Sequence, residues 1–271
     1  MMPQMAGHDA KAQEPWGFEV DRGVAIARYR RPPRNLMTFA DMEQLRPWLE
    51  SIAANKDIGV VMLASGTPGY FVGHADLEDL VALGEGRPAS GDPRIWYRTL
   101  RFIEEMPQPV VAAINGQAWG GGFELALACT LRVVSPSATF RFLEVELGLM
   151  PGAGGVQRAS RLLGPGRAAD LVLNGSTLAA EDARPLGLVN AILSSGNFEV
   201  AAQDWCGRLA AKPRRAVFAA KKALVAGLYA GYDDALREDG RSFAALMTDR
   251  EAVDLERATI DRYRTEPPAT G

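Results

Sequence analysis

The pattern of apolar and polar positions divides the chain into a mixed N-terminal part and a helical C-terminal part. Apolar and polar residues alternate over residues 18–20 and 24–29, on either side of a turn at residues 21–23, and this predicts a β-hairpin. Short apolar runs predict further strands at residues 59–64, 70–72, 110–114 and 137–142. Strands that recur with helices between them indicate an α/β core.

Helical spacing appears first after Thr38, which with Asp41 three residues later can cap a helix. We expect a short helix after residues 73–77, another over residues 95–103, and one that begins at the glycines of residues 120–122. From about residue 200 the strand signals stop. Four helical patterns follow, at residues 198–211, 213–228, 232–247 and 249–263.

These patterns predict three regions. Residues 1–15 are expected to be a disordered tail, residues 16–197 the core with the active site, and residues 198–271 a helical C-terminal region. The last region is too thin to bury its apolar faces alone, so it should pack on the core or on another subunit.

Composition narrows the class of protein. The chain has 271 residues, of which 47% are hydrophobic and 23% charged, and its formal net charge is -3. These values are typical of a globular protein and give no electrostatic footprint for nucleic acid. No apolar run suggests a secretory signal or a membrane span. Cys129 and Cys206 are expected to be reduced thiols in a cytoplasmic protein.

The central stretch, residues 115–157, carries the candidate chemistry. Three glycines at residues 120–122 begin an apolar helix, whose first N–H groups point forward with the positive end of the helix dipole. Glu124 lies in that first turn, and Glu144 follows the strand at residues 137–142. Taken alone, the glycines fit a close helix contact as well as a site. An isolated glutamate is more often a solvated or dipole-stabilised charge than a catalytic group.

Motifs of other enzyme classes are weak or missing. Residues 164–169 nominally fit a dinucleotide fingerprint, but they follow a helical pattern rather than a strand. The sequence has no Gly-Lys-Ser/Thr phosphate loop, no G-x-S-x-G elbow, and no H-E-x-x-H or paired cysteines for a metal. We therefore expect no metal site.

Several collinear segments resemble the crotonase superfamily, the enoyl-CoA hydratase/isomerase family. They are residues 32–35 (PPRN), 71–77 (FVGHADL), 112–158 (AAINGQAWGGG through GAGGVQR) and 174–189 (NG, AEDA and GLV). Several motifs in the right order are more specific than any one of them. The resemblance implies a superhelix of ββα repeats, a helical C-terminal region used for trimerisation, and acyl-CoA thioester substrates.

The resemblance also implies roles for individual residues. The two N–H donors of the family's oxyanion hole correspond to Ala75 and Gly121, and its water-activating glutamates correspond to Glu124 and Glu144. Two retained glutamates favour hydration over double-bond isomerisation. Contacts with the substrate are expected from a set at these loops: Ala75, Asp76, Leu77, Glu78 and Gly121.

The sequence departs from the family pattern at two places, one just before Ala75 and one just before Glu144. His74 stands where glycine is usual, and we interpret it as a tolerated side chain on a loop that acts through its backbone, although a histidine could titrate there. Residues 141–143 (RFL) replace the usual Gly-x-Pro, which puts the placement of Glu144 in question.

Together these features predict a 2-enoyl-CoA hydratase that needs no cofactor beyond the coenzyme A of its substrate. The expected partners are an acyl-CoA thioester and copies of the same chain, as a homotrimer or a dimer of trimers, without nucleic acid or membrane. The alternatives are an isomerase, a thioester hydrolase or a decarboxylase of the same fold, or a catalytically silent scaffold.

Overall fold

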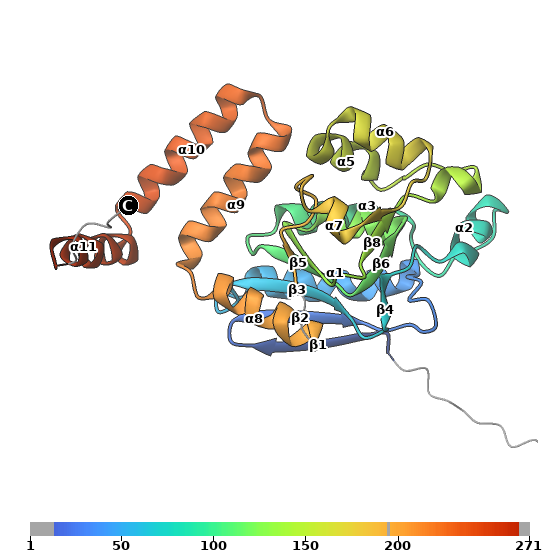
Figure 1. Cartoon of the computed structure of the whole chain (residues 1–271), viewed down its shortest axis with the longest axis horizontal. Coiled ribbons are helices and arrows are strands. Elements are labelled where there is room, and N and C mark those ends of the chain that lie inside the picture. Colours follow the sequence, from blue (N-terminus) through green and yellow to red (C-terminus); the bar gives the residue numbers. More distant parts are fainter. Residues whose placement is uncertain (1–13, 194–195, 266–271) are drawn as a thin grey trace, which may run out of the picture.

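The computed structural model describes residues 14–193 and 196–265, and Figure 1 shows their arrangement. Most of the predicted N-terminal tail, residues 1–13, lies outside the described residues. Strands β1 to β8 occur in consecutive pairs, each followed by helical structure, whereas α7 separates β9 from β10. The strands are β1 (Trp16–Asp21), β2 (Val24–Tyr29), β3 (Val60–Ser65), β4 (Gly69–Val72), β5 (Val110–Ile114), β6 (Gly116–Trp119), β7 (Leu131–Val134), β8 (Thr139–Arg141), β9 (Leu178–Ala179) and β10 (Ala191–Ile192).

Each helix that the sequence predicts is present with similar bounds, whereas η1, α5, α6 and α7 were not predicted. Thr38 caps the first helix, and its hydroxyl accepts a hydrogen bond from Asp41 N–H in the predicted capping box. The helices are α1 (Phe39–Ala54), α2 (Leu77–Gly84), α3 (Arg94–Glu105), α4 (Gly121–Ala128), the 3₁₀ helix η1 (Glu144–Leu147), α5 (Gly155–Leu163), α6 (Pro165–Leu173), α7 (Ala180–Ala183), α8 (Phe198–Ala210), α9 (Arg214–Tyr229), α10 (Tyr232–Met247) and α11 (Arg250–Thr265).

The strands form two sheets. The larger has the order β1-β2-β3-β5-β7-β10, with β1 antiparallel to β2 and the remaining neighbours parallel. The smaller has the order β4-β6-β8-β9. In the pairs β3–β4, β5–β6 and β7–β8, the first strand joins the larger sheet and the second strand joins the smaller one. The repeated strand–strand–helix units therefore wind into the superhelix that the family resemblance implies.

Four strands, β6, β7, β9 and β10, lie outside the predicted strand segments, and β6 is the one that leads into α4. The sequence reads as a turn at Asn115-Gly116 that leads directly into a helix, but β6 lies between them and pairs with β4 and β8. Its four residues are too few to show an alternating pattern. A Cβ built on Gly116 would lie 2.0 Å from the carbonyl oxygen of Gly69, so this close strand approach requires glycine.

The hydrophobic core lies on both faces of the larger sheet. One cluster fills the space between that sheet, α1, α3, α4 and the smaller sheet, and includes Tyr29, Leu45, Leu100 and Phe123. On the other face, α8 covers the strands and contributes Cys206. Both Cys129 and Cys206 are buried free thiols. The first of the four C-terminal helices therefore packs on the core.

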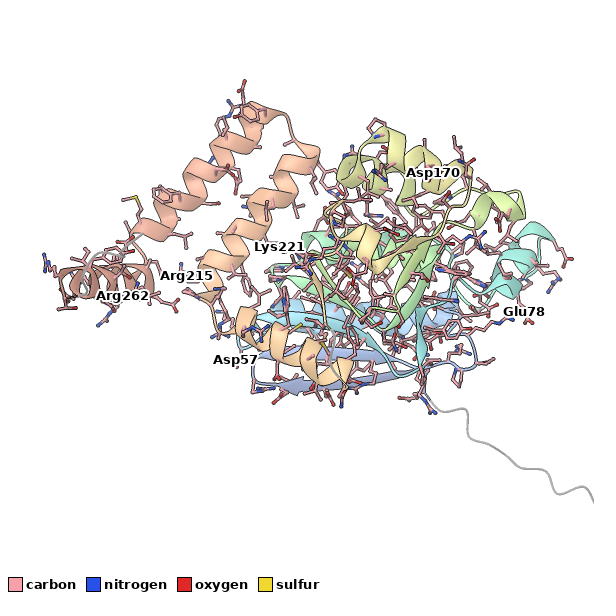
Figure 2. All side chains as sticks on the ribbon, viewed as in Figure 1. Asp57, Glu78, Asp170, Arg215, Lys221 and Arg262 are labelled. Atoms are coloured by element: carbon pink, nitrogen blue, oxygen red, sulfur yellow. The ribbon has the colours of Figure 1, made fainter. Side chains whose placement is uncertain are left out.

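The remaining C-terminal helices extend from the core as a hairpin and an arm. Figure 1 shows α10 and α11 standing away from the sheets. Lys221 of α9 is buried, and its ammonium group donates to the carbonyl oxygens of Ile103, Met106 and Gln108 at 2.7–3.0 Å. Figure 2 shows this side chain directed from α9 toward the core. None of the helices in the described ranges is long and apolar enough to cross a membrane.

Candidate active site

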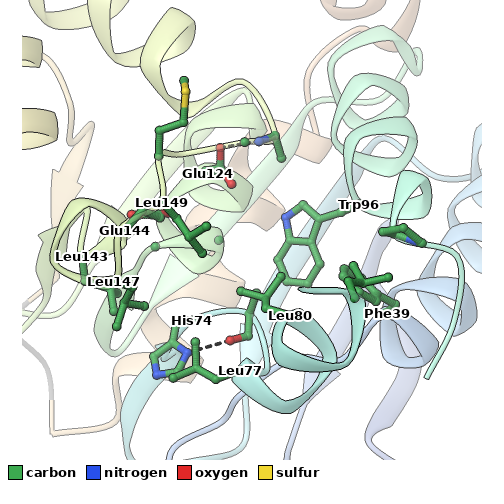
Figure 3. Close-up of a pocket in the computed structure, with 18 of the residues that line it drawn as sticks. Phe39, His74, Leu77, Leu80, Trp96, Glu124, Leu143, Glu144, Leu147 and Leu149 are labelled. Carbon is green, nitrogen blue, oxygen red and sulfur yellow. Dashed lines mark hydrogen bonds between the residues drawn. The ribbon is translucent and has the colours of Figure 1, made fainter. Parts of the chain in front are cut away.

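A cavity of about 320 Å³ lies among α2, α3, the start of α4 and η1 (Figure 3). The imidazole of His74 and the carboxyl groups of Glu124 and Glu144 are among its polar groups. Most of the wall is apolar and is formed by Phe39, Leu77, Leu80, Leu83, Trp96, Tyr97, Leu143, Leu147, Leu149, Met150 and Ala153. An apolar cleft with a few convergent polar groups is typical of a small-molecule site.

The first backbone group on this wall is the N–H of Ala75. Ala75 forms an isolated parallel bridge with Met37, in which Met37 N–H donates to His74 and Asp76 N–H donates to Met37. In such a bridge the N–H of Ala75 itself points to the opposite side. Within the described residues it has no acceptor, and Ala75 lines the cavity.

The second backbone group is the N–H of Gly121, at the start of α4. It also has no acceptor in the described part of the chain, as expected for the first turn of a helix. A Cβ built on Gly121 would lie 3.4 Å from the Cβ of Ala75 and 2.7 Å from Cζ2 of Trp96. The two residues are therefore neighbours on one cavity wall, and the Trp96 ring excludes any side chain from position 121.

Glu124 is almost fully buried, at 4% exposed, and one of its carboxylate oxygens is held firmly. Oε1 accepts hydrogen bonds from the N–H groups of Ala153 (2.8 Å) and Gly155 (2.9 Å). Burial raises the pKa of the Glu124 carboxyl, and these two N–H donors oppose that rise because they stabilise the carboxylate.

Glu144 reaches the same cavity from the first residue of η1. Its Oε2 atom is buried and has no hydrogen-bond partner among the described residues. Burial, with a smaller contribution from the nearby charge of Glu124, raises the pKa of the Glu144 carboxyl from 4.5 to about 7. A cavity with two such carboxyl groups can hold a proton and a water molecule near neutral pH.

The segment before Glu144 is fixed without the usual Gly-x-Pro. Phe142 is fully buried, and its ring centroid lies 4.6 Å from that of Phe123 in α4. Arg141 Nε donates to the carbonyl oxygen of Gly175 at 2.8 Å. Phe142 thus attaches this segment to α4, and Arg141 attaches it to the loop at Gly175. With the segment held in this way, Glu144 lies on the cavity wall.

The other residues predicted to contact the substrate differ in their placement. Leu77 lines the cavity beside Ala75. Asp76 caps α2, with Oδ1 accepting from Glu78 N–H at 2.8 Å, and Glu78 is exposed; neither of these two lines the cavity. His74 does line it, with Nδ1 2.7 Å from the carbonyl oxygen of Ala75.

Sequence reasoning missed Trp96 as a site residue. Its side chain is 5% exposed and lines the cavity, and its Nε1 is buried without an acceptor in the described residues. Along α3 it falls on the same apolar face as Leu100 and Ile103, so its spacing could not distinguish it from a core residue.

Strand–strand–helix units wound around a cavity at the start of α4 are the features of the crotonase fold. The solved structure of an enoyl-CoA hydratase from Geobacillus kaustophilus superimposes with a TM-score of 0.84 at 27% identity, covering 93% of this chain and 96% of that one. An enoyl-CoA hydratase/isomerase from Cupriavidus metallidurans gives 0.84 at 28% identity, over 96% and 100% of the two chains.

Sequence comparison agrees with the fold. The family model for enoyl-CoA hydratase/isomerase matches residues 19–257. A short-chain-enoyl-CoA hydratase from Clostridium acetobutylicum is 29% identical over 252 residues, which cover 92% of this chain and 95% of that protein. The chain therefore belongs to the enoyl-CoA hydratase/isomerase family.

Proposed function

We propose that this protein is a 2-enoyl-CoA hydratase, which adds water across the α,β double bond of an acyl-CoA thioester. The observation that carries the proposal is the meeting of four groups in one cavity: the free N–H groups of Ala75 and Gly121 and the carboxyl groups of Glu124 and Glu144. The names of the relatives, which include enoyl-CoA hydratases, support the same activity.

The two N–H groups form the oxyanion hole of this proposal. When water adds to C3, the electrons of the C2=C3 bond move toward the thioester and give an enolate with negative charge on the carbonyl oxygen. Two donors already aimed at that oxygen stabilise the charge with little reorganisation, by roughly 3–4 kcal/mol each in comparable sites. The hole uses backbone groups of Ala75 and Gly121, so it does not depend on their side chains.

The two carboxyl groups divide the proton transfers. Glu124, whose Oε1 already accepts two N–H bonds, is better suited to be ionised and to take a proton from water as the oxygen bonds to C3. Glu144 is better suited to carry the proton, since its Oε2 has no donor among the described residues and its pKa is about 7. It delivers this proton to C2, which completes the 3-hydroxyacyl-CoA, and exchange with solvent then restores both groups.

The proposal also covers the oligomeric state, the cofactor requirement and the cellular location of the enzyme. Exposed apolar side chains lie along α9, α10 and α11, and they support a homotrimer or a dimer of trimers built through these helices: Leu224, Leu228, Leu236, Phe243, Met247, Leu255 and Ile260. The reaction needs no cofactor beyond the coenzyme A of the substrate. The two free thiols support a cytoplasmic location.

Glutamine substitutions test the activity. Glu124→Gln and Glu144→Gln should each retain binding of a saturated acyl-CoA, because the backbone donors and the apolar wall remain, yet each should lower hydration by about 10²–10⁴-fold. The measurement is the loss of the ultraviolet absorbance of the conjugated enoyl thioester, over a panel of chain lengths. Near-full hydratase activity in Glu144→Gln would rule out the two-carboxyl mechanism.

A double-bond isomerase would behave differently. It would shift the double bond of a 3-enoyl-CoA, and one glutamine substitution would abolish that activity while the other would have little effect. A wild-type protein that turns over neither a 2-enoyl-CoA nor a 3-enoyl-CoA would contradict both activities.

A further inference from the structure

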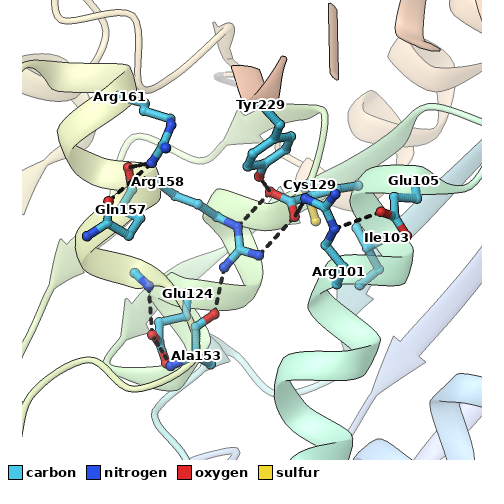
Figure 4. A network of polar contacts seen from close by, with 12 residues as sticks. Arg101, Ile103, Glu105, Glu124, Cys129, Ala153, Gln157, Arg158, Arg161 and Tyr229 are labelled. Atoms are coloured by element: carbon cyan, nitrogen blue, oxygen red, sulfur yellow. Dashed lines mark hydrogen bonds and ion pairs between the residues drawn. The ribbon is translucent and has the colours of Figure 1, made fainter. Parts of the chain in front are cut away.

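A chain of polar contacts, buried at Glu104 and partly exposed at Tyr229, runs from the loop behind Glu124 to the last residue of α9 (Figure 4). At its centre is Arg158 of α5, whose side chain is 10% exposed. Nε and Nη2 donate to the two carboxylate oxygens of Glu104 at 2.7 and 2.9 Å. Nη1 donates to the carbonyl oxygen of Ala153 at 2.7 Å. The planar guanidinium thus binds the Glu104 carboxylate through two parallel hydrogen bonds and, through its remaining nitrogen, clamps the loop at Ala153.

The clamped loop is the one that holds the carboxylate of Glu124. Ala153 donates its own N–H to Glu124 Oε1, and Gly155 donates to the same oxygen. Arg158 therefore fixes the carbonyl group of a residue whose N–H group fixes Glu124. The hydrogen bonds that link the guanidinium to the carboxylate run through the backbone of Ala153.

The loop has little stiffness of its own. Residues 152–155 read Gly-Ala-Gly-Gly, and Gly154 adopts a φ of +96°. A Cβ built on Gly154 would lie 2.6 Å from Nη1 of Arg158, so the guanidinium packs directly against the glycine backbone. Because glycine restrains the backbone weakly, contacts from outside must select the conformation that presents two N–H groups to Glu124.

We propose that Arg158 is a positioning residue for Glu124: held by Glu104, it sets the 152–155 loop and so fixes Glu124 for proton transfer. This proposal rests on the proposed function, because it gives Glu124 its proton-transfer role. The residue acts through Ala153 and does not line the cavity itself.

Charge adds to the effect of geometry. The positive charge of Arg158 lowers the pKa of the Glu124 carboxyl against the rise that burial causes. A variant that keeps the positive charge but loses the paired hydrogen bonds to Glu104 should therefore change the pKa of Glu124 less than a variant that loses both. Lysine and glutamine at position 158 make that comparison.

The outer end of the chain links the clamp to the C-terminal helices. The hydroxyl of Tyr229, the last residue of α9, donates to Glu104 Oε1 at 2.7 Å. The guanidinium of Arg101 lies 4.3 Å from the centroid of the Tyr229 ring. Tyr229→Phe therefore offers a mild perturbation, which removes one hydrogen bond from Glu104 and leaves Arg158 in place.

The experiment compares Arg158→Lys and Arg158→Gln with Arg161→Gln. Arg161 lies one turn further along α5, and its side-chain hydrogen bonds go to Gln157, so it is a matched control for charge on the helix. We expect both substitutions at 158 to lower kcat for hydration by about 10–100-fold while the Kd for a saturated acyl-CoA stays within about twofold. Arg161→Gln and Tyr229→Phe should stay within about threefold of wild type.

The pH profile separates positioning from general loss of structure. Loss of a nearby positive charge raises the pKa of a carboxyl group, so the acidic limb of kcat/KM should move to higher pH in Arg158→Gln and much less in Arg158→Lys. A damaged fold would lower the fraction of active enzyme without moving that limb. An Arg158→Lys enzyme with more than half the wild-type kcat would overturn the proposal, as would acyl-CoA binding that weakens in proportion to kcat.

Two further measurements keep the result interpretable. Arg158→Gln removes two charge-assisted hydrogen bonds from the buried Glu104 carboxylate and leaves it the Tyr229 hydroxyl at 2.7 Å and Arg101 at 3.8 Å. A Glu104→Met/Arg158→Met double variant, which removes both charges, should therefore fold and show the same loss of kcat. Infrared titration of the protonated carboxyl band, assigned by its loss in Glu124→Gln, follows Glu124 without turnover. If wild type hydrates no enoyl-CoA, the proposed function fails, whereas an unchanged Glu124 titration in Arg158→Gln contradicts the positioning role alone.

Discussion

Replacing Glu144 by glutamine should make the protein more stable above neutral pH while it removes activity. Glu144 is half-buried, with one oxygen that has no donor within the described residues, and its pKa is about 7 compared with 4.5 for an ordinary glutamate. The native state therefore keeps a proton that the unfolded chain releases between pH 4.5 and 7. Stability falls as the pH rises through this window, and the full cost is present above pH 7.

The size of this cost follows from the shift in pKa. A difference of about 2.5 pKa units corresponds to about 3.4 kcal/mol, and partial exposure of the side chain reduces this to about 2–3 kcal/mol. Glutamine has nearly the same shape and carries no charge, so it avoids the cost. For a domain of this size, 1 kcal/mol corresponds to about 2–4 °C in Tm, so Glu144→Gln should melt about 5–10 °C above wild type at pH 8.5.

Circular dichroism melts at pH 4.5 and pH 8.5, at one protein concentration, measure the effect. The two proteins should melt at similar temperatures at the lower pH and diverge at the higher. Glu146→Gln is the control, because Glu146 lies in the same turn but pairs with Arg141 at the surface. The Tm of this variant should not rise with pH relative to that of wild type. If the melting temperatures of wild type and Glu144→Gln run parallel across this range, burial of a charged Glu144 is not the cause.

The remaining predictions concern the backbone, the C-terminal helices and the assembly. Gly121→Ala should lower hydration by at least about 10²-fold, because its Cβ would displace the amide or the adjoining indole, whereas Gly166→Ala, which meets open space on a helix, should leave steady-state kinetics unchanged. Lys221→Met leaves three carbonyl groups, in the last turn of α3 and the segment after it, without their ammonium donor and should cost about 3 kcal/mol or more in urea unfolding, against less than about 1 kcal/mol for the exposed Lys222→Met. His74→Gly should reduce kcat/KM by no more than about threefold, since backbone hydrogen bonds to Asn35 and Met37 hold the loop without the imidazole. Light scattering should give a mass well above that of one chain, and a monomer at working concentration would contradict the proposed assembly.

Local patterns were sufficient for most of the fold. The capping pair Thr38 and Asp41 marked the start of α1, and helical spacing marked α10 at its observed bounds, Tyr232–Met247. These signals arise from contacts within a few residues of each other. Strand β6 depends instead on pairing with β4 and β8, which lie far away in the sequence, so four residues gave no local signal.

The site was less accessible to sequence reasoning. Glu124 and Glu144 were identified through resemblance, because neither differs locally from an ordinary surface or helix-end glutamate. The positions of Trp96 and Arg158 depend on three-dimensional contacts. Trp96 appears in the sequence as one more apolar residue of α3, and Arg158 as a surface charge on α5, although its guanidinium is buried between Glu104 and Ala153.

The pairing of Ala75 and Gly121 has a practical consequence for mutational scanning. Position 75 is already alanine, so an alanine scan would pass over it, and at position 121 the scan would report a steric clash rather than the loss of a donor. Half of the polar groups proposed to meet the substrate would thus be invisible to side-chain substitution. Replacing the amide by an ester at residue 75 through semisynthesis would delete the donor while keeping the side chain, and so would measure its contribution directly.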